Sequence, residues 1–313
     1  MRTFDSDALE CLAAIVEEGG FERAAVRLSV TQSAVSQRLR ALEAQVGTVL
    51  LVRSRPIKPT AAGRLLIRHA MQMRLLRADL ETDLQDLAPG AGTPGEEERV
   101  AIAINADSIA TWALAALGPL VSAGLPLEII TDDQDFTHEW LREGQVLGCV
   151  TTLKKALRGC KVLPLGAMHY VAVASAAYAQ AHCPEGLTPH NFRKIAFIAF
   201  NRKDDLQTEF VGRACGLRRV TLSQRFVPSS EGQVRAALAG WGASVVPELQ
   251  VRALLASGEL VNLAPQLALP VNLYWHCWNL PSAVIDRLTA ALASAAAAAL
   301  GATAPRARAS AHQ

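Results

Sequence analysis

The sequence predicts an α/β protein in which a small helical domain is followed by a long helix and by a larger domain of alternating strands and helices. Cations are concentrated near the N-terminus: the segment 23–77 holds eleven Lys and Arg residues against one acid, whereas the whole chain of 313 residues has a net charge of only +2. A run rich in Pro and Gly, residues 89–95, then separates two parts of the chain. Beyond it, apolar segments of strand length alternate with helical patterns, which indicates a sheet covered by helices.

Composition and the first residues exclude several classes of protein. Half of the residues are hydrophobic and 19% are charged, which excludes a disordered or collagen-like chain. The acids Asp5, Asp7 and Glu10 stand where a signal peptide would carry bases and an apolar run, so a cytoplasmic location is expected. The uncharged run 108–127 has the length of a membrane span, but its Gly and Pro residues indicate a buried helix and a loop, so no membrane segment is expected.

Residues 1–59 are expected to form one small domain. Capping residues, helical spacing of apolar residues and terminal glycines delimit three short helices. They are expected from the cap at Asp5 or Ser6 to Gly19, over 21–28, and from the cap at Thr31 to Gly47. A strand-like run, 49–52, then precedes a basic segment with two prolines. Three short helices and a basic hairpin are the parts of a winged helix-turn-helix.

The third helix has two faces of different character. Val35, Leu39, Leu42 and Val46 form one apolar stripe, and the opposite face is small and polar, with no carboxylate. Small side chains let a helix approach base edges in the major groove, where Gln and Arg read them, and a basic wing holds phosphate or enters the minor groove. Such a face and loop alone can be merely solvated, but the surplus of cations favours double-stranded DNA. The candidate DNA contacts are Gln32, Ser33, Ser36, Gln37, Arg38, Arg40, Arg53, Arg55 and Lys58.

A long helix is expected from its cap at Thr60 to about Ala88. An apolar residue recurs every seven positions along it, and a helix of this length spans about 40 Å. Because no neighbouring element is expected to cover this repeat, it predicts the seam of a homodimer. Residues 60–95 are therefore interpreted as a dimerisation helix and a hinge. The seam consists of Leu66, Met73, Leu80 and Leu87.

The chain after residue 95 has the pattern of an α/β domain. Strands are expected over 100–104, 127–131, 146–151, 170–175, 195–200, 224–227, 243–246 and 271–276. Helices are expected over 108–117, 135–143, 204–215, 231–240, 248–256 and 282–300. Apolar strands that alternate with helices imply a mostly parallel sheet with helices on both faces. No core-forming residue follows Leu300, so residues 301–313 are expected to be a disordered tail.

Polar residues follow three of the expected strands. In open α/β sheets, ligands collect at the carboxyl ends of strands, beside helix N-termini that attract anions. Three such ends in one domain favour a small-molecule site. They carry Asn105, Asp107 and Ser108 after the first strand, Thr151 and Thr152 after the third, and Ser229, Ser230 and Glu231 after the sixth.

The sequence lacks the motifs of common enzymes and metal sites. It contains no G-x-S-x-G, no H-E-x-x-H, no P-loop and no G-x-G-x-x-G after a strand, and its histidines lack the spacing of metal ligands. The protein is therefore not expected to be an enzyme or to hold a metal or a cofactor. The six cysteines include no C-x-x-C pair, so free thiols are expected, although the closeness of Cys149 and Cys160 leaves a redox pair open.

Residues 4–66 resemble the N-terminal domain of the LysR-type transcriptional regulators. Val52 departs from the family, in which Phe is usual at this position. With this departure and its Phe-Glu-Arg run at 21–23, the chain is similar to the ArgP/LysG branch, and the likeness covers about residues 4–300. It is carried by Gly20 to Ala25, Leu28, Thr31 to Arg38, Leu42, Glu43, Gly47, Leu50 to Arg53, Pro59, Thr60, Gly63, Asn105 to Ser108, Ala110 to Trp112, Ser229 to Glu231 and Leu273 to His276.

This resemblance implies that residues 96–300 form a two-lobed effector domain like the periplasmic binding proteins. Lobe I would comprise about 96–165 and 268–300, and lobe II about 166–267. The branch answers to lysine and arginine and controls basic amino-acid export, which implies one of these amino acids as co-effector. The family also implies a homodimer that can pair into a homotetramer, with RNA polymerase as a partner. Two alternatives remain: a regulator that answers to another small metabolite, and an architectural DNA-binding protein without an effector.

A lysine or arginine bound between the lobes presents three charges, and the sequence offers a partner for each. Its carboxylate is expected at helix N-termini and hydroxyl groups, and its two cations at carboxylates near strand ends. A Ser or Thr there can also be only a helix cap, and an acid only a favourable charge at a helix N-terminus. The candidate effector residues are Asp107, Ser108, Asp132, Thr151, Thr152, Asp204, Ser230 and Glu231.

Overall fold

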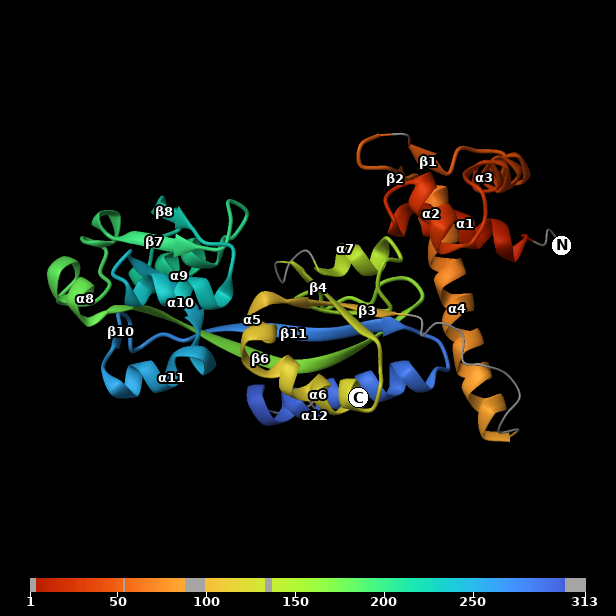
Figure 1. Ribbon diagram of the computed structural model, residues 1–313. Coiled ribbons are helices and arrows are strands. Elements are labelled where there is room, and N and C mark those ends of the chain that lie inside the picture. The colour runs from red at the N-terminus through yellow and green to blue at the C-terminus, as the bar shows by residue number, and fades with distance from the viewer. Residues whose placement is uncertain (1–3, 53, 88–98, 133–136, 302–313) are drawn as a thin grey trace, which may run out of the picture.

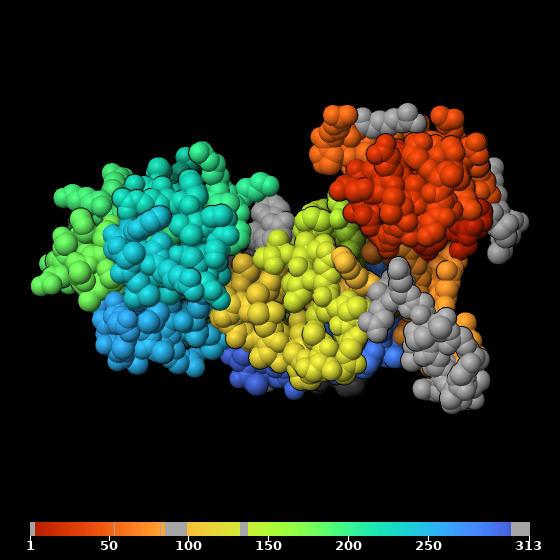
Figure 2. All heavy atoms as spheres, viewed as in Figure 1, coloured from red at the N-terminus to blue at the C-terminus, as the bar shows by residue number. Residues whose placement is uncertain are grey.

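The computed structural model describes residues 4–52, 54–87, 99–132 and 137–301. In Figure 1 a helical domain sits at one end of the long helix α4, and an elongated α/β domain lies beside that helix. Figure 2 shows the α/β domain as two adjoining bodies, one of which is next to the helical domain and α4. The expected α/β fold class and the order of its parts are confirmed. The expected linker and the expected tail after Gly301 lie outside the described residues.

The helical domain contains three helices and a hairpin, as expected. Asp5 and Thr31 accept backbone hydrogen bonds at the starts of α1 and α3, and Thr60 does so before α4. The apolar stripe of α3 is buried against α1. The elements are α1 (Ser6–Glu17), α2 (Phe21–Arg27), α3 (Gln32–Val46), β1 (Leu51–Val52), β2 (Lys58–Pro59) and, beyond the domain, α4 (Ala61–Leu87).

The N-terminal half of α4 is covered by the helical domain, so the expectation that no element would cover its repeat was wrong. Ile67 is buried in the core of that domain, and Leu66 and Met73 pack against the same core. Farther along the helix the repeat faces solvent, and Leu80 is 55% exposed. The side chain of Leu87 lies outside the described residues. The repeat is therefore divided between a core inside the chain and a free surface.

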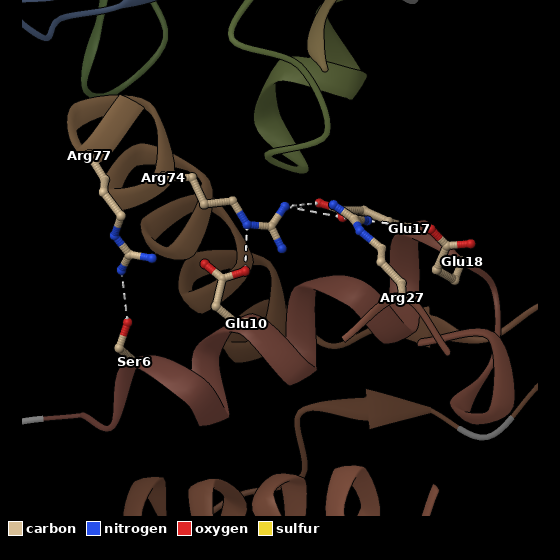
Figure 3. Close-up of polar contacts among 7 residues, drawn as sticks. All are labelled: Ser6, Glu10, Glu17, Glu18, Arg27, Arg74 and Arg77. Atoms are coloured by element: carbon tan, nitrogen blue, oxygen red, sulfur yellow. Dashed lines mark hydrogen bonds and ion pairs between the residues drawn. The ribbon is translucent and has the colours of Figure 1, made fainter. Parts of the chain in front are cut away.

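An ion-pair network joins α4 to α1 (Figure 3). The Arg74 guanidinium donates from Nε to Glu10 at 2.6 Å and from Nη1 to Glu17 at 2.9 Å, and only 9% of its side chain is exposed. Arg27 of α2 pairs with the same Glu17. Because these charges are partly shielded from water, their attraction is stronger than that of a surface pair. The network holds the helical domain in place on α4.

The α/β domain is built on a nine-stranded sheet. Its strand order is β4-β3-β5-β11-β6-β9-β7-β8, and β10 pairs with β6 outside this path. The strands are β3 (Val100–Asn105), β4 (Leu127–Asp132), β5 (Gly148–Thr151), β6 (Cys160–Ser175), β7 (Ala196–Ala199), β8 (Ser223–Phe226), β9 (Ala243–Pro247), β10 (Leu260–Asn262) and β11 (Leu269–Trp278).

The expectation of a mostly parallel sheet was wrong. β3 is parallel to β4 and β5, and β7 is parallel to β8 and β9. The other four described pairings all involve β6 or β11 and are antiparallel. The alternation of strands and helices correctly indicates the two parallel groups, but it does not reveal that two long strands pair with each other and join the groups.

β6 leads the chain from the first parallel group to the second, and β11 leads it back to the first (Figure 1). We call the part around β3, β4 and β5 the first lobe and the part around β7 to β10 the second lobe. Only the second half of β6 was predicted, because its first half lacks a continuous buried run and contains Pro164 and Gly166. The short strand β10 and the helix α8 were not predicted.

Helices cover the sheet, and most lie within a few residues of their expected positions. The helical segment after β3 continues to Ser122 through Pro119, beyond its expected end. The apolar helix α12 is long enough to cross a membrane by length and composition alone, but its residues Leu288 and Leu292 are buried in the core of the α/β domain. The elements are α5 (Ala106–Ser108), η1 (Ile109–Ala113), α6 (Leu114–Ser122), α7 (Thr137–Arg142), α8 (Ala176–His182), η2 (Phe192–Lys194), α9 (Leu206–Cys215), α10 (Ser230–Leu238), α11 (Glu248–Ser257) and α12 (Ala283–Leu300).

The sheet order excludes the redox pair of Cys149 and Cys160. These residues lie on β5 and β6, which are separated by β11. Two strand spacings amount to about 9.5 Å, beyond the Cα separation of about 7 Å that a disulfide can bridge. Burial also raises the pKa of both thiols, that of Cys160 to about 11. Both cysteines are free in the structure.

Candidate functional site

The polar face of α3 lies on the surface of the helical domain. Gln32, Ser33, Gln37 and Arg40 are exposed, and Ser36 is partly buried. The Gln32 amide donates to the Ser36 hydroxyl at 3.1 Å, which links the first turn of the helix to the second. An exposed polar helix face of this kind is what insertion into a major groove requires.

Arg38 does not face the same way. Its Nη2 lies 3.1 Å from the carboxylate of Asp7, and its Nη1 lies 3.9 Å from the sulfur of Cys11, both on α1. The guanidinium of Arg38 is thus turned toward α1 in this structure, and its contact with DNA stays a prediction. The position of Arg38 on the flank of α3 brings it within reach of an acid from another helix, which the pattern of α3 alone cannot show.

The hairpin after α3 is short and basic. β1 and β2 pair antiparallel through Leu51 opposite Pro59 and Val52 opposite Lys58. Lys58 is exposed, as is Arg55 in the connection between the strands. Arg53 lies outside the described residues.

The cations of segment 23–77 are less available for DNA than their number suggests. Arg27, Arg38 and Arg74 pair with acids of α1 or of the residue after it, and these acids stand just before the counted segment. The exposed cations around α3 and the hairpin include Arg40, Arg55 and Lys58.

We expect Gln37→Ala and Lys58→Ala to weaken DNA binding in different ways. Gln37 is exposed on the polar face of α3 that is predicted to read bases, so its loss should cost about 1–3 kcal/mol on the operator and relax the preference at one base pair. Loss of a phosphate contact from Lys58 should weaken all sequences alike and reduce the salt slope by about one. Affinities for operator and scrambled duplexes at several salt concentrations separate the two effects. Equal losses on both duplexes for Gln37→Ala would contradict its assignment.

The carboxylate of Asp107 lies where the two lobes meet. It accepts hydrogen bonds from the hydroxyl of Tyr170 at 2.6 Å and from the hydroxyl of Ser230 at 2.5 Å. Asp107 follows β3 in the first lobe, Tyr170 lies on β6, and Ser230 begins α10 in the second lobe. Burial raises the pKa of Asp107, and the two hydrogen bonds partly oppose this effect. One carboxylate thus joins three elements from both lobes.

Two buried polar side chains beside Asp107 have no hydrogen-bond partner among the described residues. Asn105, the last residue of β3, is 1% exposed, and both its amide nitrogen and its oxygen are unpaired. The hydroxyl of Ser108 is also buried and unpaired. Such groups are rare in native proteins because each costs free energy. They lie at the start of a helical segment that runs from 106 to 122, where the helix dipole favours an anion.

Other predicted effector residues are placed nearby, but their roles differ. Asp204 is close enough for its charge to raise the pKa of Asp107. Its two oxygens, however, accept the backbone N–H groups of Phe200 and Leu206, each at 2.9 Å, as in a helix cap. Thr151 is buried at the end of β5, and Thr152 after it is partly buried.

Glu231 is not brought to Asp107. It is exposed, and its carboxylate lies 3.9 Å from Arg235 one turn along α10. Successive residues on a helix differ by about 100° in direction, so the residue after the inward-facing Ser230 points away. The predicted role of Glu231 in effector binding gains no support from this geometry and stays a prediction. The side chain of Asp132 lies outside the described residues.

Sequence reasoning missed two side chains at this junction. Tyr170 lies in the buried run of β6, and its hydroxyl reaches Asp107. Gln250, in the first turn of α11, places its Oε1 3.1 Å from the hydroxyl of Ser230. A buried Tyr usually finds a polar partner, but nothing in the local pattern indicates which one. Among the described residues, no three His, Cys, Asp or Glu side chains are grouped so that they could hold a metal ion.

Two family models match the chain. One, the bacterial regulatory helix-turn-helix protein of the lysR family, matches residues 6–64, and the other, the LysR substrate binding domain, matches residues 95–297. Curated relatives include the HTH-type transcriptional regulator LysG of Mycobacterium tuberculosis, 41% identical over 292 residues, which are 93% of each chain. The regulator ArgP of Pseudomonas aeruginosa is 42% identical over 294 residues, 92% of this chain and 95% of its own.

Solved structures show the same likeness over the full length. ArgP from Mycobacterium tuberculosis superimposes with a TM-score of 0.82 at 41% identity, covering 94% of this chain and 98% of its own. Full-length LysG from Corynebacterium glutamicum with bound effector Arg has a TM-score of 0.73 at 36% identity, covering 95% and 99%. The chain belongs to the LysR family of bacterial transcriptional regulators, DNA-binding and effector-binding proteins that are not enzymes.

Proposed function

We propose that this regulator senses free lysine or arginine and controls a basic amino-acid exporter or related genes. The observation that carries the proposal is the grouping of a carboxylate, Asp107, with the unpaired polar groups of Asn105 and Ser108 where the lobes meet. A basic amino acid carries cations that need carboxylates and a carboxylate that needs donors. Relatives named LysG and ArgP, and the LysG structure with bound effector Arg, support this choice.

The ligand's charges divide between two sets of groups. Asp107 would hold an ammonium or guanidinium group, and Asp204 would add a second negative charge nearby. The ligand carboxylate would accept hydrogen bonds from Ser108, Asn105 and the first N–H groups of the helical segment after β3. Burial raises the pKa of Asp107, and a cation bound beside it would oppose this effect by favouring the ionised carboxylate.

Calorimetry with arginine, lysine, a neutral amino acid and a dicarboxylate tests the proposal. Binding of arginine or lysine, with little heat from the other two ligands, is the expected result. Binding confined to the dicarboxylate or to the neutral amino acid would show a regulator of another metabolite. If none of the four binds, this effector class is wrong, and an architectural role on DNA becomes the better description.

The assembly we propose is a homodimer through α4 that pairs into a homotetramer, with double-stranded DNA and RNA polymerase as partners in the cytoplasm. The exposed residues Leu76, Leu80 and Leu84 follow one another at intervals of four on α4, so they form one apolar stripe. A second copy of the same helix would bury that stripe.

We expect Leu80→Glu to dissociate this assembly. The substitution places a charge in the middle of the apolar stripe, where a paired helix would have to desolvate it. Sedimentation velocity should then show a smaller particle than the wild type. Leu217→Glu is the control, because Leu217 is also an exposed leucine but follows α9 in the second lobe and is not part of α4. Unchanged sedimentation of Leu80→Glu would show that this stripe is not the seam.

A further inference from the structure

One segment of α4 is in contact with both domains of its own chain. Ile67, Ala70 and Arg74 recur at intervals of three and four and are buried against the helical domain. Leu75 is buried in the core of the α/β domain. Met71 packs against both cores. This stretch of helix therefore connects the two cores directly, in addition to the covalent linker.

α4 and the first lobe are in close contact at Gly144. A Cβ atom placed on Gly144 would lie 2.8 Å from the Cβ of Arg68 and 2.9 Å from its Cα. These distances are shorter than atoms tolerate, and the obstructing atoms include backbone that cannot rotate away. Gly144 also has a φ of +78°, which favours glycine. The position thus permits a contact of one backbone with another that no larger residue would allow.

Gly144 ends α7, and the other end of α7 is bonded to β5, the strand that leads to the predicted effector residues Thr151 and Thr152. The N–H groups of Gly144 and Gln145 bond to the carbonyls of Leu141 and Trp140, which closes the helix in a Schellman-type cap. At the other end, the Thr137 hydroxyl donates at 2.6 Å to the carbonyl of Val150, the residue before Thr151. A shift at the carboxyl end of β5 would therefore move α7 and, with it, the contact at Gly144.

We propose that the contact of Gly144 with Arg68, together with the packing of Met71 and Leu75 on the α/β core, couples effector binding to DNA binding within one subunit. A displacement of α7 shifts α4, and the ion pairs of Arg74 transmit that shift to α1 and so to α3, which packs on α1 (Figure 3). The inference rests on the proposed function, since it requires an effector in the α/β domain. It adds the structural path by which effector binding in the α/β domain alters the position of the DNA-binding helix.

Gly144→Ala and Gly159→Ala form a matched pair of variants for testing this coupling. Gly159 also lies in the first lobe and has a φ of +79°, but a Cβ there meets nothing within 4 Å. Both substitutions therefore impose the same backbone strain, and only Gly144→Ala pushes against α4. Thermal unfolding verifies that both variants are folded. Calorimetry then measures arginine affinity with and without operator DNA, and DNA affinity is measured with and without arginine.

In the wild type and in Gly159→Ala, arginine should change DNA affinity by a factor in the usual range of about 5- to 150-fold, and DNA should change arginine affinity by the same factor. In Gly144→Ala, both factors should fall together toward one, while arginine still binds. Equal coupling in the two variants overturns the proposal and leaves the proposed function standing. A wild type that binds neither arginine nor lysine overturns both, and calorimetry alone reveals that outcome.

Discussion

Asp107→Asn is expected to abolish the response to arginine and lysine while leaving DNA binding without effector unchanged. Removing one charge of a buried, hydrogen-bonded ion pair costs about 2–5 kcal/mol, or about 30-fold to several thousand-fold in affinity. Asn has nearly the same shape as Asp, so the junction of the lobes should persist. The hydroxyl of Ser230, which now donates to Asp107, can turn to Gln250 Oε1, 3.1 Å away, and accept from the new amide.

The same carboxylate predicts a pH dependence of arginine affinity. Burial raises the pKa of Asp107 in the free protein, and a bound cation lowers it, so binding releases a proton. Affinity should therefore be full above the raised pKa and fall as the pH decreases through it. Asp107→Asn removes the titrating group and should flatten this part of the profile. A smaller pH dependence should remain from Asp204, because burial raises the pKa of that carboxyl group as well.

Glu231→Gln is the matched control for Asp107→Asn. It also removes one carboxylate from the start of a helix, but Glu231 is exposed and lies 3.9 Å from Arg235. Calorimetry should give wild-type arginine affinity for this variant. Wild-type affinity in Asp107→Asn, or a loss in Glu231→Gln as large as that in Asp107→Asn, would refute the assignment of Asp107 to the ligand's cation.

Arg74→Met is expected to destabilise the helical domain and leave the α/β domain folded. The substitution keeps apolar volume in place but leaves Glu10 and Glu17 without their shared cation. Breaking a buried pair costs about 3–5 kcal/mol. Because the two carboxylate side chains remain 20% and 24% exposed, we expect the lower end of that range, about 3 kcal/mol.

The distribution of tryptophan makes this prediction testable in the intact chain. All five Trp residues lie beyond residue 100, in the α/β domain. Circular dichroism should therefore report an early loss of helix in Arg74→Met, while tryptophan fluorescence should change only at the wild-type midpoint. Arg213→Met is the control, since its pair with Glu209 is about half exposed and such a pair contributes about 0.5 kcal/mol or less. A wild-type helix transition in Arg74→Met would contradict the role of the network.

Local elements of this protein follow from local sequence. The caps at Asp5, Thr31 and Thr60 stand where expected, because a capping hydrogen bond joins residues two or three apart. The spacing of Val35 and Leu39 likewise identifies the buried face of α3. The first half of β6 has no such signal, since it lacks a continuous buried run and is held in place by pairing with β11.

The candidate effector site could be predicted only in part. Asp107 and Ser230 were found because polar residues that follow the strands of an α/β sheet are candidates for a ligand site. Their hydrogen bond joins residues 123 positions apart, and no local pattern reveals it. Tyr170 and Gln250 were missed because one lies in a buried strand and the other on an ordinary helix turn, with nothing nearby to mark a polar partner.

The sequence alone is sufficient to identify the family, the DNA-binding module and the limits of most helices, because these depend on short-range hydrogen bonds and on periodic burial. Only the folded chain shows which cations are already paired and which face of α4 remains free. It also reveals that two antiparallel strands join the lobes. These features depend on contacts between distant residues, such as Arg74 with Glu10, 64 positions apart. Burial and charge pairing then depend on how the helices and strands pack, which the spacing within a single element does not specify.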